Sequence, residues 1–253
     1  MLRGSFAQNV RQARELLREK GLWSFIREDV RNWLDRLAVQ WRTGHHIRGF
    51  HRLYYHAAYN DPPQTWKTCS WLGVPALKCP LDLFVYQEIL WTMRPAVIVE
   101  TGTAAGGSAL YLASLCDLLG QGEVITVDIV DACQAQHPRI TRIIGSSTDP
   151  AVVAQVHERV ADRPALVILD SDHARDHVLD ELAAYSTLVP VGGYLIVEDS
   201  NIHGHPVGWQ YGPGPTEAIR EFLRKHDDFV IDRHCERHLL TFNPGGYLRR
   251  VRG

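Results

Sequence analysis

The chain has 253 residues, of which 45% are apolar, and its formal net charge is −2. This length and composition predict one sizeable globular domain with an appendage, and the near-neutral charge excludes a chain that is basic throughout, as many nucleic-acid-binding proteins are. Five scattered cysteines form no CxxC pair, which argues against a disulfide framework or a zinc site and favours a reducing, cytoplasmic compartment. No apolar run is long enough to span a bilayer, and the chain begins without the apolar core of a signal peptide.

Residues 6–41 have the pattern of an amphipathic helix. The apolar residues that recur every three or four positions are Trp23, Ile26, Val30, Trp33, Leu37 and Trp41. Residues 1–52 carry 11 Lys and Arg against 5 Asp and Glu. Three roles stay open for this segment: a helical layer packed on the main domain, a basic surface for an anionic membrane or a partner, and a swapped element of an oligomer.

Residues 43–82 are rich in His, Tyr, Trp and Pro and show little periodicity. They indicate either an irregular connector whose rings belong to the core or a substrate lid lined with aromatic side chains. Residues 83–93 predict a helix that leads into the first strand. We place the domain boundary after residue 60, with an N-terminal helical extension (1–60) and a main domain (61–253).

Strand and helix patterns alternate from Ala96 onward. The predicted strands are 96–100, 123–127, 140–144, 165–170 and 193–198; the predicted helices are 107–119, 149–161, 174–187 and 215–226; two short strand-like runs follow at 229–232 and 238–242. Such alternation is typical of βαβ crossovers, so we expect an α/β protein with a parallel sheet and helices on both faces.

The first strand ends in Glu100 and is followed by a turn that contains Gly102, Gly106 and Gly107. A strand, a glycine turn and a helix N-terminus present backbone N–H groups and the helix dipole to a nucleotide-like ligand. The turn departs from the GxGxxG pattern, and an acidic residue at the strand end suits a cationic group better than a pyrophosphate. The second strand leads to Asp128, whose carboxylate can accept both hydroxyls of a ribose.

The third strand leads to Ser146 and Ser147, which are small and polar enough to border an adenine ring. In this order, the three strand ends resemble the class I S-adenosylmethionine (SAM)-dependent methyltransferases. The resemblance implies that the methionine part, the ribose and the adenine of SAM lie against these strand ends in turn. The implied cofactor-binding residues are Glu100, Gly102, Thr103, Ala104, Gly106, Gly107, Ser108, Asp128, Ser146, Ser147 and Asp170.

Three more carboxylates follow the fourth and fifth strands: Asp170, Glu198 and Asp199. Because the carboxyl ends of parallel strands meet at one edge of a sheet, we expect these groups to converge. Converging carboxylates repel one another unless a cation neutralises them, and a hard divalent ion such as Mg²⁺ prefers oxygen ligands. Asp172 is instead expected to cap the following helix.

His173 lies three residues after Asp170, about one helical turn away. If Asp170 binds a cation, the imidazole can reach a substrate hydroxyl whose pKa that cation lowers, and can accept its proton. A solvated histidine in the first turn of a helix is the plainer interpretation. His203 and His205 follow the acidic pair closely and either contact substrate or hold a loop.

The pattern Asp-x-x-His followed by Glu-Asp on the next strand resembles Mg²⁺-dependent sugar O-methyltransferases of macrolide pathways. The longer pattern resembles the cephalosporin hydroxylase/rhamnosyl O-methyltransferase family over about residues 65–250. The matching segments are 82–87, 99–108, 145–150, 169–173 with His177 and Glu181, 197–206, 212–215 with Ala218 and Phe222, and 239–249. The resemblance implies a Rossmann-like class I methyltransferase sheet, mostly parallel, with an antiparallel C-terminal strand.

The resemblance further implies Mg²⁺-dependent methyl transfer from SAM to a hydroxyl of a sugar or glycosylated acceptor, such as a glycolipid. The implied metal ligands are Asp170, Glu198 and Asp199, and the implied catalytic residues are His173 and Asp170. We also expect a homo-oligomer, no nucleic-acid partner, and peripheral membrane contact through the basic N-terminal helices. The alternatives are a catechol-type O-methyltransferase, a non-catalytic SAM-binding scaffold and, if SAM does not bind, a nicotinamide dehydrogenase.

Overall fold

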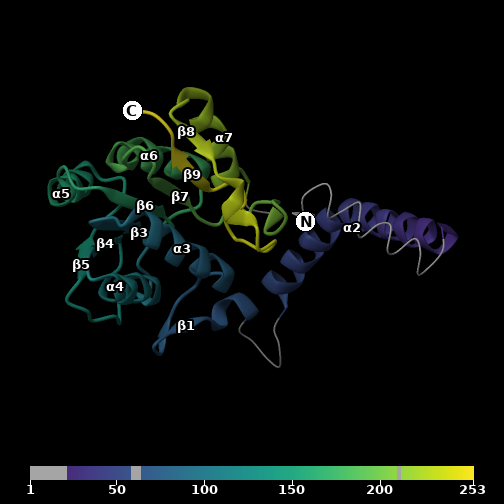
Figure 1. Ribbon diagram of the computed structural model, residues 1–253. Helices are drawn as coiled ribbons and strands as arrows, with labels where there is room; N and C mark the ends of the chain where they lie inside the picture. The colour runs from purple at the N-terminus through teal and green to yellow at the C-terminus, as the bar shows by residue number, and fades with distance from the viewer. Residues whose placement is uncertain (1–21, 58–63, 210–211) are drawn as a thin grey trace. The chain divides into compact units, whose positions relative to one another are not determined.

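The computed structural model describes residues 22–57, 64–209 and 212–253 (Figure 1). Its contacts divide the chain into two compact units, Met1–Gly49 and Phe50–Gly253. This division falls inside helix α2 (Leu22–His56), whereas the sequence led us to expect a boundary after residue 60. Residues 1–21 of the predicted helical extension, and Tyr59 in the aromatic region, lie outside the described residues.

Helix α2 continues through residues 43–56, which the sequence analysis predicted to be irregular; that prediction is wrong. His51, Tyr54 and Tyr55 recur at helical spacing, so tertiary contacts on one helix face stabilise the last turns. The Nε2 atom of the buried His51 lies 2.7 Å from the carbonyl oxygen of Thr241. Both tyrosine rings contact the ring of Phe242, with centroids 5.9 and 6.4 Å apart.

A seven-stranded sheet forms the centre of the unit Phe50–Gly253, with strand order β5-β4-β3-β6-β7-β9-β8. The strands are β3 (Val97–Thr101), β4 (Glu123–Asp128), β5 (Ile140–Ile144), β6 (Ala165–Leu169), β7 (Tyr194–Val197), β8 (Phe229–Ile231) and β9 (Tyr247–Arg250). The pairs from β5 to β7 are parallel, and β9 is antiparallel to both of its neighbours. The expected mostly parallel sheet with an antiparallel C-terminal strand is therefore confirmed.

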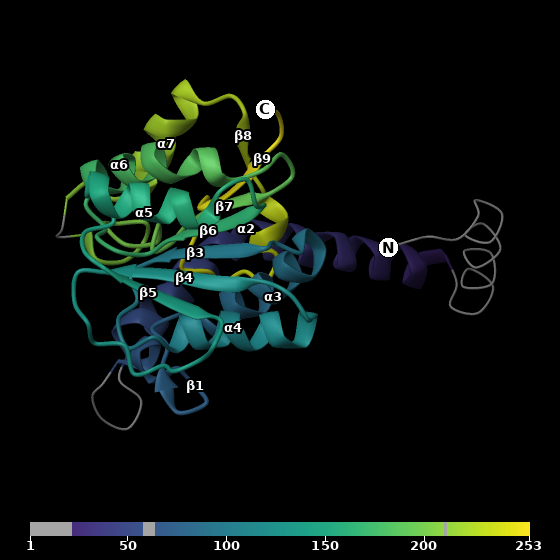
Figure 2. The same cartoon turned by 90° about the vertical axis from the view of Figure 1, so that its left-hand side faces the viewer.

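Helices cover both faces of this sheet, as Figure 2 shows. They are α3 (Pro80–Met93) and α4 (Gly107–Leu119) on one side, and α5 (Pro150–Val160), α6 (Arg175–Tyr185) and α7 (Pro215–Lys225) on the other. Side chains alternate between two cores, because successive strand residues point to opposite faces. On β3, Val97 and Val99 pack with α5, α6 and α7, whereas Ile98 packs with α3 and α4.

Residues 238–242 do not form the predicted strand. Their apolar side chains pack elsewhere: Leu240 and Phe242 form a small buried cluster with Cys79, against Tyr54, Tyr55 and Trp66. The last strand is instead β9, which pairs with β7 and β8. A short 3₁₀ turn (Arg233–Glu236) connects β8 to this region.

Between α2 and α3 lie a 3₁₀ turn (Thr65–Thr68) and a two-stranded hairpin, β1 (Ser70–Trp71) and β2 (Val74–Pro75). A second 3₁₀ turn (Ser186–Leu188) follows α6. All five cysteines are free thiols. None of the helices in the described part of the chain combines the length and the hydropathy that a membrane crossing requires.

Candidate active site at the carboxyl ends of the strands

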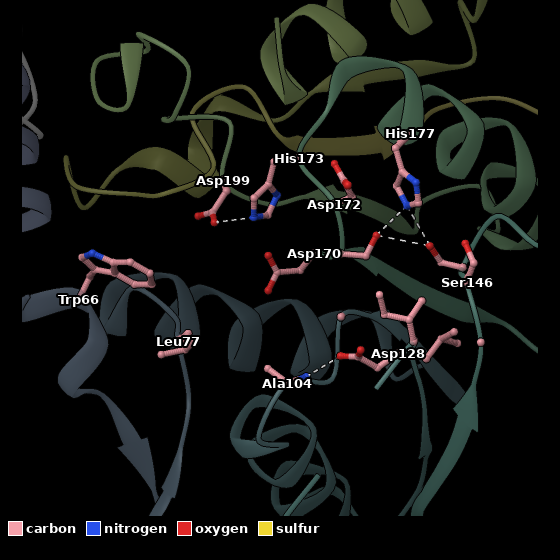
Figure 3. Close-up of a pocket in the computed structure, with 16 residues that line it drawn as sticks. Trp66, Leu77, Ala104, Asp128, Ser146, Asp170, Asp172, His173, His177 and Asp199 are labelled. Atoms are coloured by element: carbon pink, nitrogen blue, oxygen red, sulfur yellow. Dashed lines mark hydrogen bonds and ion pairs between the residues drawn. The ribbon is translucent and has the colours of Figure 1, made fainter. Parts of the chain in front are cut away.

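A cavity of about 610 Å³ opens at the carboxyl ends of the parallel strands (Figure 3). Most of the side chains around it follow β3, β4, β5, β6 and β7, because the parallel strands all end at this edge. Its lining residues are Trp66, Leu77, Gly102, Ala104, Val127, Asp128, Ile129, Gly145, Ser146, Ser147, Asp170, Ser171, Asp172, His173, His177 and Asp199. Eight of the predicted site residues are in this list.

The turn after β3 depends on the missing side chain of Gly102. Its φ is +85°, and a Cβ atom there would lie 1.9 Å from the carbonyl oxygen of Asp170. The ends of β3 and β6 can therefore approach only with glycine at this position. Two residues on, Ala104 has φ +45°, and its N–H donates to Asp128 Oδ2 at 2.8 Å. The turn after β3 is thus connected directly to the carboxylate predicted to hold a ribose.

Glu100 is fully buried below this turn. Its Oε2 accepts a hydrogen bond from Thr126 Oγ1 at 2.8 Å, while Oε1 has no partner among the described residues. Burial raises the pKa of this carboxyl, and the charge of Lys78 and hydroxyl donors oppose that rise. An unpaired buried acceptor is costly, so Oε1 fits a ligand donor such as the ammonium group of a methionine part.

Besides Glu100, four predicted cofactor residues lie outside the cavity lining: Thr103, Gly106, Gly107 and Ser108. Thr103 Oγ1 bonds Thr126 Oγ1 at 2.7 Å, so it extends the network around Glu100. A Cβ at Gly107 would lie 2.2 Å from the carbonyl oxygen of Pro75, which shows that this position packs the helix start against β2. Their assignment to the cofactor stays a prediction.

At the other end of the cavity, three polar side chains meet at His177 Nε2. Ser147 Oγ lies 3.1 Å from it and Ser171 Oγ 3.0 Å, and Ser171 Oγ donates to Glu181 Oε1 at 2.7 Å. Glu181 is fully buried, its Oε1 lies 3.7 Å from His177 Nε2, and this direct interaction raises the pKa of His177. Ser146, beside them in Figure 3, also faces the cavity. Small polar side chains line this end, and the role of Ser146 and Ser147 as an adenine border stays a prediction.

Asp170, His173 and Asp199 form the acidic end, where one ligand atom from each lies within 4.8 Å of the other two. His173 Nε2 lies 3.2 Å from Asp199 Oδ2. Burial lowers the pKa of His173, but the hydrogen bond to Asp199 and the charges of Asp199 and Asp170 outweigh it and raise the pKa to about 9. Asp172 Oδ1 accepts from the N–H of Ala174 at 2.7 Å, in the turn before α6. The N-cap residue of α6 is Ala174, without a side-chain cap hydrogen bond, so the expectation that Asp172 caps this helix is wrong.

The backbone of Asp199 is held in an uncommon conformation, with φ +51°. Its N–H donates to Asn243 Oδ1 at 3.1 Å, and Asn243 Nδ2 donates to the Tyr86 hydroxyl at 2.9 Å. A non-glycine residue with positive φ persists only where its surroundings compensate the strain, and such positions cluster at functional sites. The buried Asn243 thus orients Asp199 toward the cavity.

Glu198 is not among the residues that line the cavity, and its Oε1 accepts from Lys78 Nζ at 2.7 Å. The same ammonium donates to Asp170 Oδ2. Burial raises the pKa of both carboxyls, while the charge of Lys78 opposes that rise. The side chains of Lys78 and Glu198 are only 3% and 4% exposed. The structure therefore brings Asp170 and Glu198 together, as predicted, but around a lysine.

Sequence reasoning missed two side chains at the site, Lys78 and His177 as a partner of Ser147. Trp66, which lines the cavity, is one of the aromatic residues of the segment for which a substrate lid was one of two interpretations. Lys78 belongs to the same aperiodic segment, 43–82, where no local pattern signals a function for a lysine. The spacing of His177 and Glu181 could have identified this pair, because residues four apart lie on the same face of a helix such as α6.

His203 and His205 lie in the loop that follows β7, and their hydrogen bonds hold this loop in place. His203 Nδ1 lies 2.7 Å from the carbonyl oxygen of Gly212, and His205 Nε2 lies 2.7 Å from Glu217 Oε1. Neither lines the cavity. Two aromatic residues follow these histidines in the chain: Trp209 is 81% exposed, and Tyr211 lies outside the described residues.

Comparison with known proteins identifies the family. The family model for Rhamnosyl O-methyltransferase/CmcI matches residues 63–251. The chain is 37% identical over 210 residues to a rhamnosyl O-methyltransferase of Mycobacterium tuberculosis, covering 79% of this chain and 83% of that protein. It is 39% identical over 194 residues to the Mycobacterium leprae protein of the same name, covering 73% and 84%.

Among solved structures, CmcI-D160 with Mg and SAM is similar, with a TM-score of 0.60 and 25% identity. That similarity covers 79% of this chain and 84% of the other. The expected class I methyltransferase fold and the resemblance noted in the sequence are both confirmed. The chain belongs to the Rhamnosyl O-methyltransferase/CmcI family.

Proposed function

We propose that this chain is a SAM-dependent O-methyltransferase that uses Mg²⁺ and methylates a hydroxyl of a sugar or glycosylated acceptor. Its relatives are named rhamnosyl O-methyltransferases, and a similar structure contains Mg and SAM. The observation that carries the proposal is the convergence of the glycine turn with Asp170, His173 and Asp199 in one cavity. Methyl transfer needs a cofactor, an activated hydroxyl and a proton acceptor at one place.

The residues that we propose for SAM lie at the ends of β3, β4 and β5. The unpaired Oε1 of Glu100 fits the ammonium group, Asp128 fits the ribose hydroxyls, and Ser146 and Ser147 fit the adenine end. Asp128 uses one lone pair of Oδ2 on Ala104 N–H and one of Oδ1 on Val130 N–H, and each oxygen keeps another for a ligand. The two backbone donors fix the orientation of this carboxylate.

The residues for the ion are Asp170, Asp199 and Glu198. Asp170 and Asp199 offer oxygen atoms at the cavity, which is the ligand type that Mg²⁺ prefers. Glu198 adds a negative charge next to Lys78, which also pairs with Asp170, and Glu198 stays a predicted ligand. When bound, SAM supplies the methyl group and the divalent ion lowers the pKa of the acceptor hydroxyl.

Asp199 Oδ2 accepts from the N–H of His173 Nε2 and holds the imidazole in place, so Nδ1 is the ring nitrogen that accepts the hydroxyl proton. A divalent cation bound to Asp170 and Asp199 would offset the negative charges that raise the pKa of His173. It would therefore favour the neutral imidazole, which is the form that can accept a proton. Trp66 and Leu77 bound the cavity near these groups and fit the less polar surface of a sugar ring.

Three finer statements belong to this proposal as predictions. The first is a glycolipid as the acceptor, which the basic residues of the N-terminal segment would suit at an anionic membrane surface. The second is a homo-oligomeric assembly. The third is a sugar hydroxyl rather than a catechol, since a histidine, and not a lysine, lies three positions after Asp170.

The experiment is transfer of labelled methyl from SAM to a panel of sugar-bearing acceptors, with Mg²⁺ or with EDTA, using the wild-type chain and the Asp170→Ala variant. We expect transfer that EDTA and the substitution each reduce at least about a hundredfold. Asp176→Ala is the matched control, because that carboxylate is 87% exposed on α6. Equal rates for wild type with Mg²⁺ and Asp170→Ala in EDTA would remove the metal from the proposal.

A further inference from the structure

Lys78 is the buried cation of the acidic end. It follows β2 and precedes α3, its side chain is 3% exposed, and its Nζ donates to Asp170 and to Glu198. Lys78 therefore pairs with carboxylates from two neighbouring strand ends.

These carboxylates are also the predicted ligands of the divalent ion. Asp170, Glu198 and Asp199 carry three negative charges, and Lys78 cancels one of them. The affinity of a site for a divalent cation depends strongly on the charge of its ligands. Two cations that share Asp170 repel each other in a partly desolvated site, where Coulomb interactions are stronger than in water.

We propose that Lys78 is an internal counter-ion that competes with the divalent ion for Asp170 and Glu198. It holds these carboxylates together in the protein without metal, and it weakens the binding of the ion. The inference rests on the proposed function, because it assumes a divalent ion at the acidic end. Lys78 acts through Asp170 and Glu198 and is a positioning residue.

A consequence follows for stability. Without the charge of Lys78, Asp170 and Glu198 repel each other in a buried place, which destabilises the metal-free protein. An ion that binds only the folded state stabilises it more as its affinity increases. Loss of Lys78 should therefore lower the melting temperature without metal and increase the rise that Mg²⁺ causes.

The test compares wild type with substituted forms of the same 253-residue chain, by calorimetric titration with MgCl₂ at pH 8 and by thermal unfolding over the same Mg²⁺ range. Lys78→Gln keeps hydrogen-bond donors but removes the charge, and Lys78→Arg keeps the charge. Lys225→Gln is the matched control, because Lys225 is an exposed lysine on α7 that pairs with Glu221. Wild type is the reference.

We expect Lys78→Gln to bind Mg²⁺ about tenfold more tightly than wild type, and to show a larger Mg²⁺-induced rise in melting temperature. Lys78→Arg and Lys225→Gln should bind with the wild-type affinity. Equal or weaker binding by Lys78→Gln overturns the inference. Failure of wild type to bind Mg²⁺ overturns the metal site of the proposed function instead, so the two failures are distinguishable.

Folding of Lys78→Gln is itself informative. A variant that folds with Mg²⁺ and unfolds when EDTA is added supports the inference, because the ion then replaces the missing charge. A variant that stays unfolded at every Mg²⁺ concentration counts against it. Lys78→Met, which lacks both charge and donors, should show the same Mg²⁺ dependence with a lower melting temperature.

Discussion

Asp82, at the start of α3, binds the segment that follows residue 240, and this segment in turn contacts Asp199 at the acidic end of the cavity. Its Oδ2 accepts from the N–H of Phe242 at 2.7 Å, and its Oδ1 accepts from the Tyr247 hydroxyl at 2.8 Å. The segment held in this way contains Asn243, which orients Asp199. Burial raises the pKa of Asp82 to about 7, although three hydrogen bonds oppose that rise.

The sign of the pH effect follows from this shift. The pKa of Asp82 is near 3.8 in the unfolded chain and about 7 in the folded one, so the folded state binds the proton more tightly. The stabilisation is complete below about pH 4 and is lost as the pH rises toward 7. At about 1.4 kcal/mol per pH unit, the loss over the whole window is about 4 kcal/mol.

Asp82→Asn removes this titration and keeps the shape of the side chain. The amide oxygen can accept from Phe242, and the amide NH₂ can donate to the Tyr247 oxygen. We propose urea unfolding of both proteins at pH 5, 6, 7 and 8, followed by tryptophan fluorescence. The unfolding free energy of wild type minus that of Asp82→Asn should fall by about 2.5 kcal/mol from pH 5 to pH 8.

Taking this difference cancels the titration of other groups, such as Asp170 and Glu198. Asp176→Asn is the control, because its carboxylate is exposed and its difference from wild type should stay flat. A wild-type minus Asp82→Asn difference that is the same at pH 5 and pH 8 would refute the reasoning. A difference that rises with pH would mean that Asp82 is ionised and stabilised by its donors.

Three further predictions concern the cavity. Gly102→Ala should destabilise the fold by about 1–3 kcal/mol and weaken SAM binding in calorimetry, because its Cβ would lie 1.9 Å from the Asp170 carbonyl oxygen; an unchanged melting temperature would contradict this. Asp128→Asn should raise the dissociation constant of SAM about tenfold or more, while thermal stability stays near that of wild type. Trp66→Ala should raise KM for a sugar acceptor about tenfold and leave the SAM dissociation constant unchanged, whereas an equal loss in both would place Trp66 at the cofactor.

The inner strands β3, β6 and β7 could be predicted because each is mostly buried on both faces and contains an apolar run. Helix α4 begins and ends at the predicted residues, 107 and 119. The C-terminal end could not be predicted in the same way. Residues 238–242 and Tyr247–Arg250 are both short and partly apolar, and only their packing partners decide which one joins the sheet.

The arrangement of the candidate site, too, could be predicted only in part from the sequence. Local spacing predicts that His173 lies near Asp170, and parallel topology predicts that Asp199 joins them, because neighbouring strand ends meet at one edge. The environment of Glu198 could not be predicted. Its partner Lys78 is 120 residues away in the chain, and no periodic pattern connects the two.

By itself the sequence determined the order of strands and helices, the glycine turn and the carboxylates that follow the strands, because these depend on periodicity and on residues adjacent in the chain. Only the tertiary structure decided the extent of α2, the identity of the last strand and the place of Lys78 between Asp170 and Glu198. These features depend on contacts between segments that lie far apart in the sequence, where burial and charge pairing, rather than local preference, select the conformation.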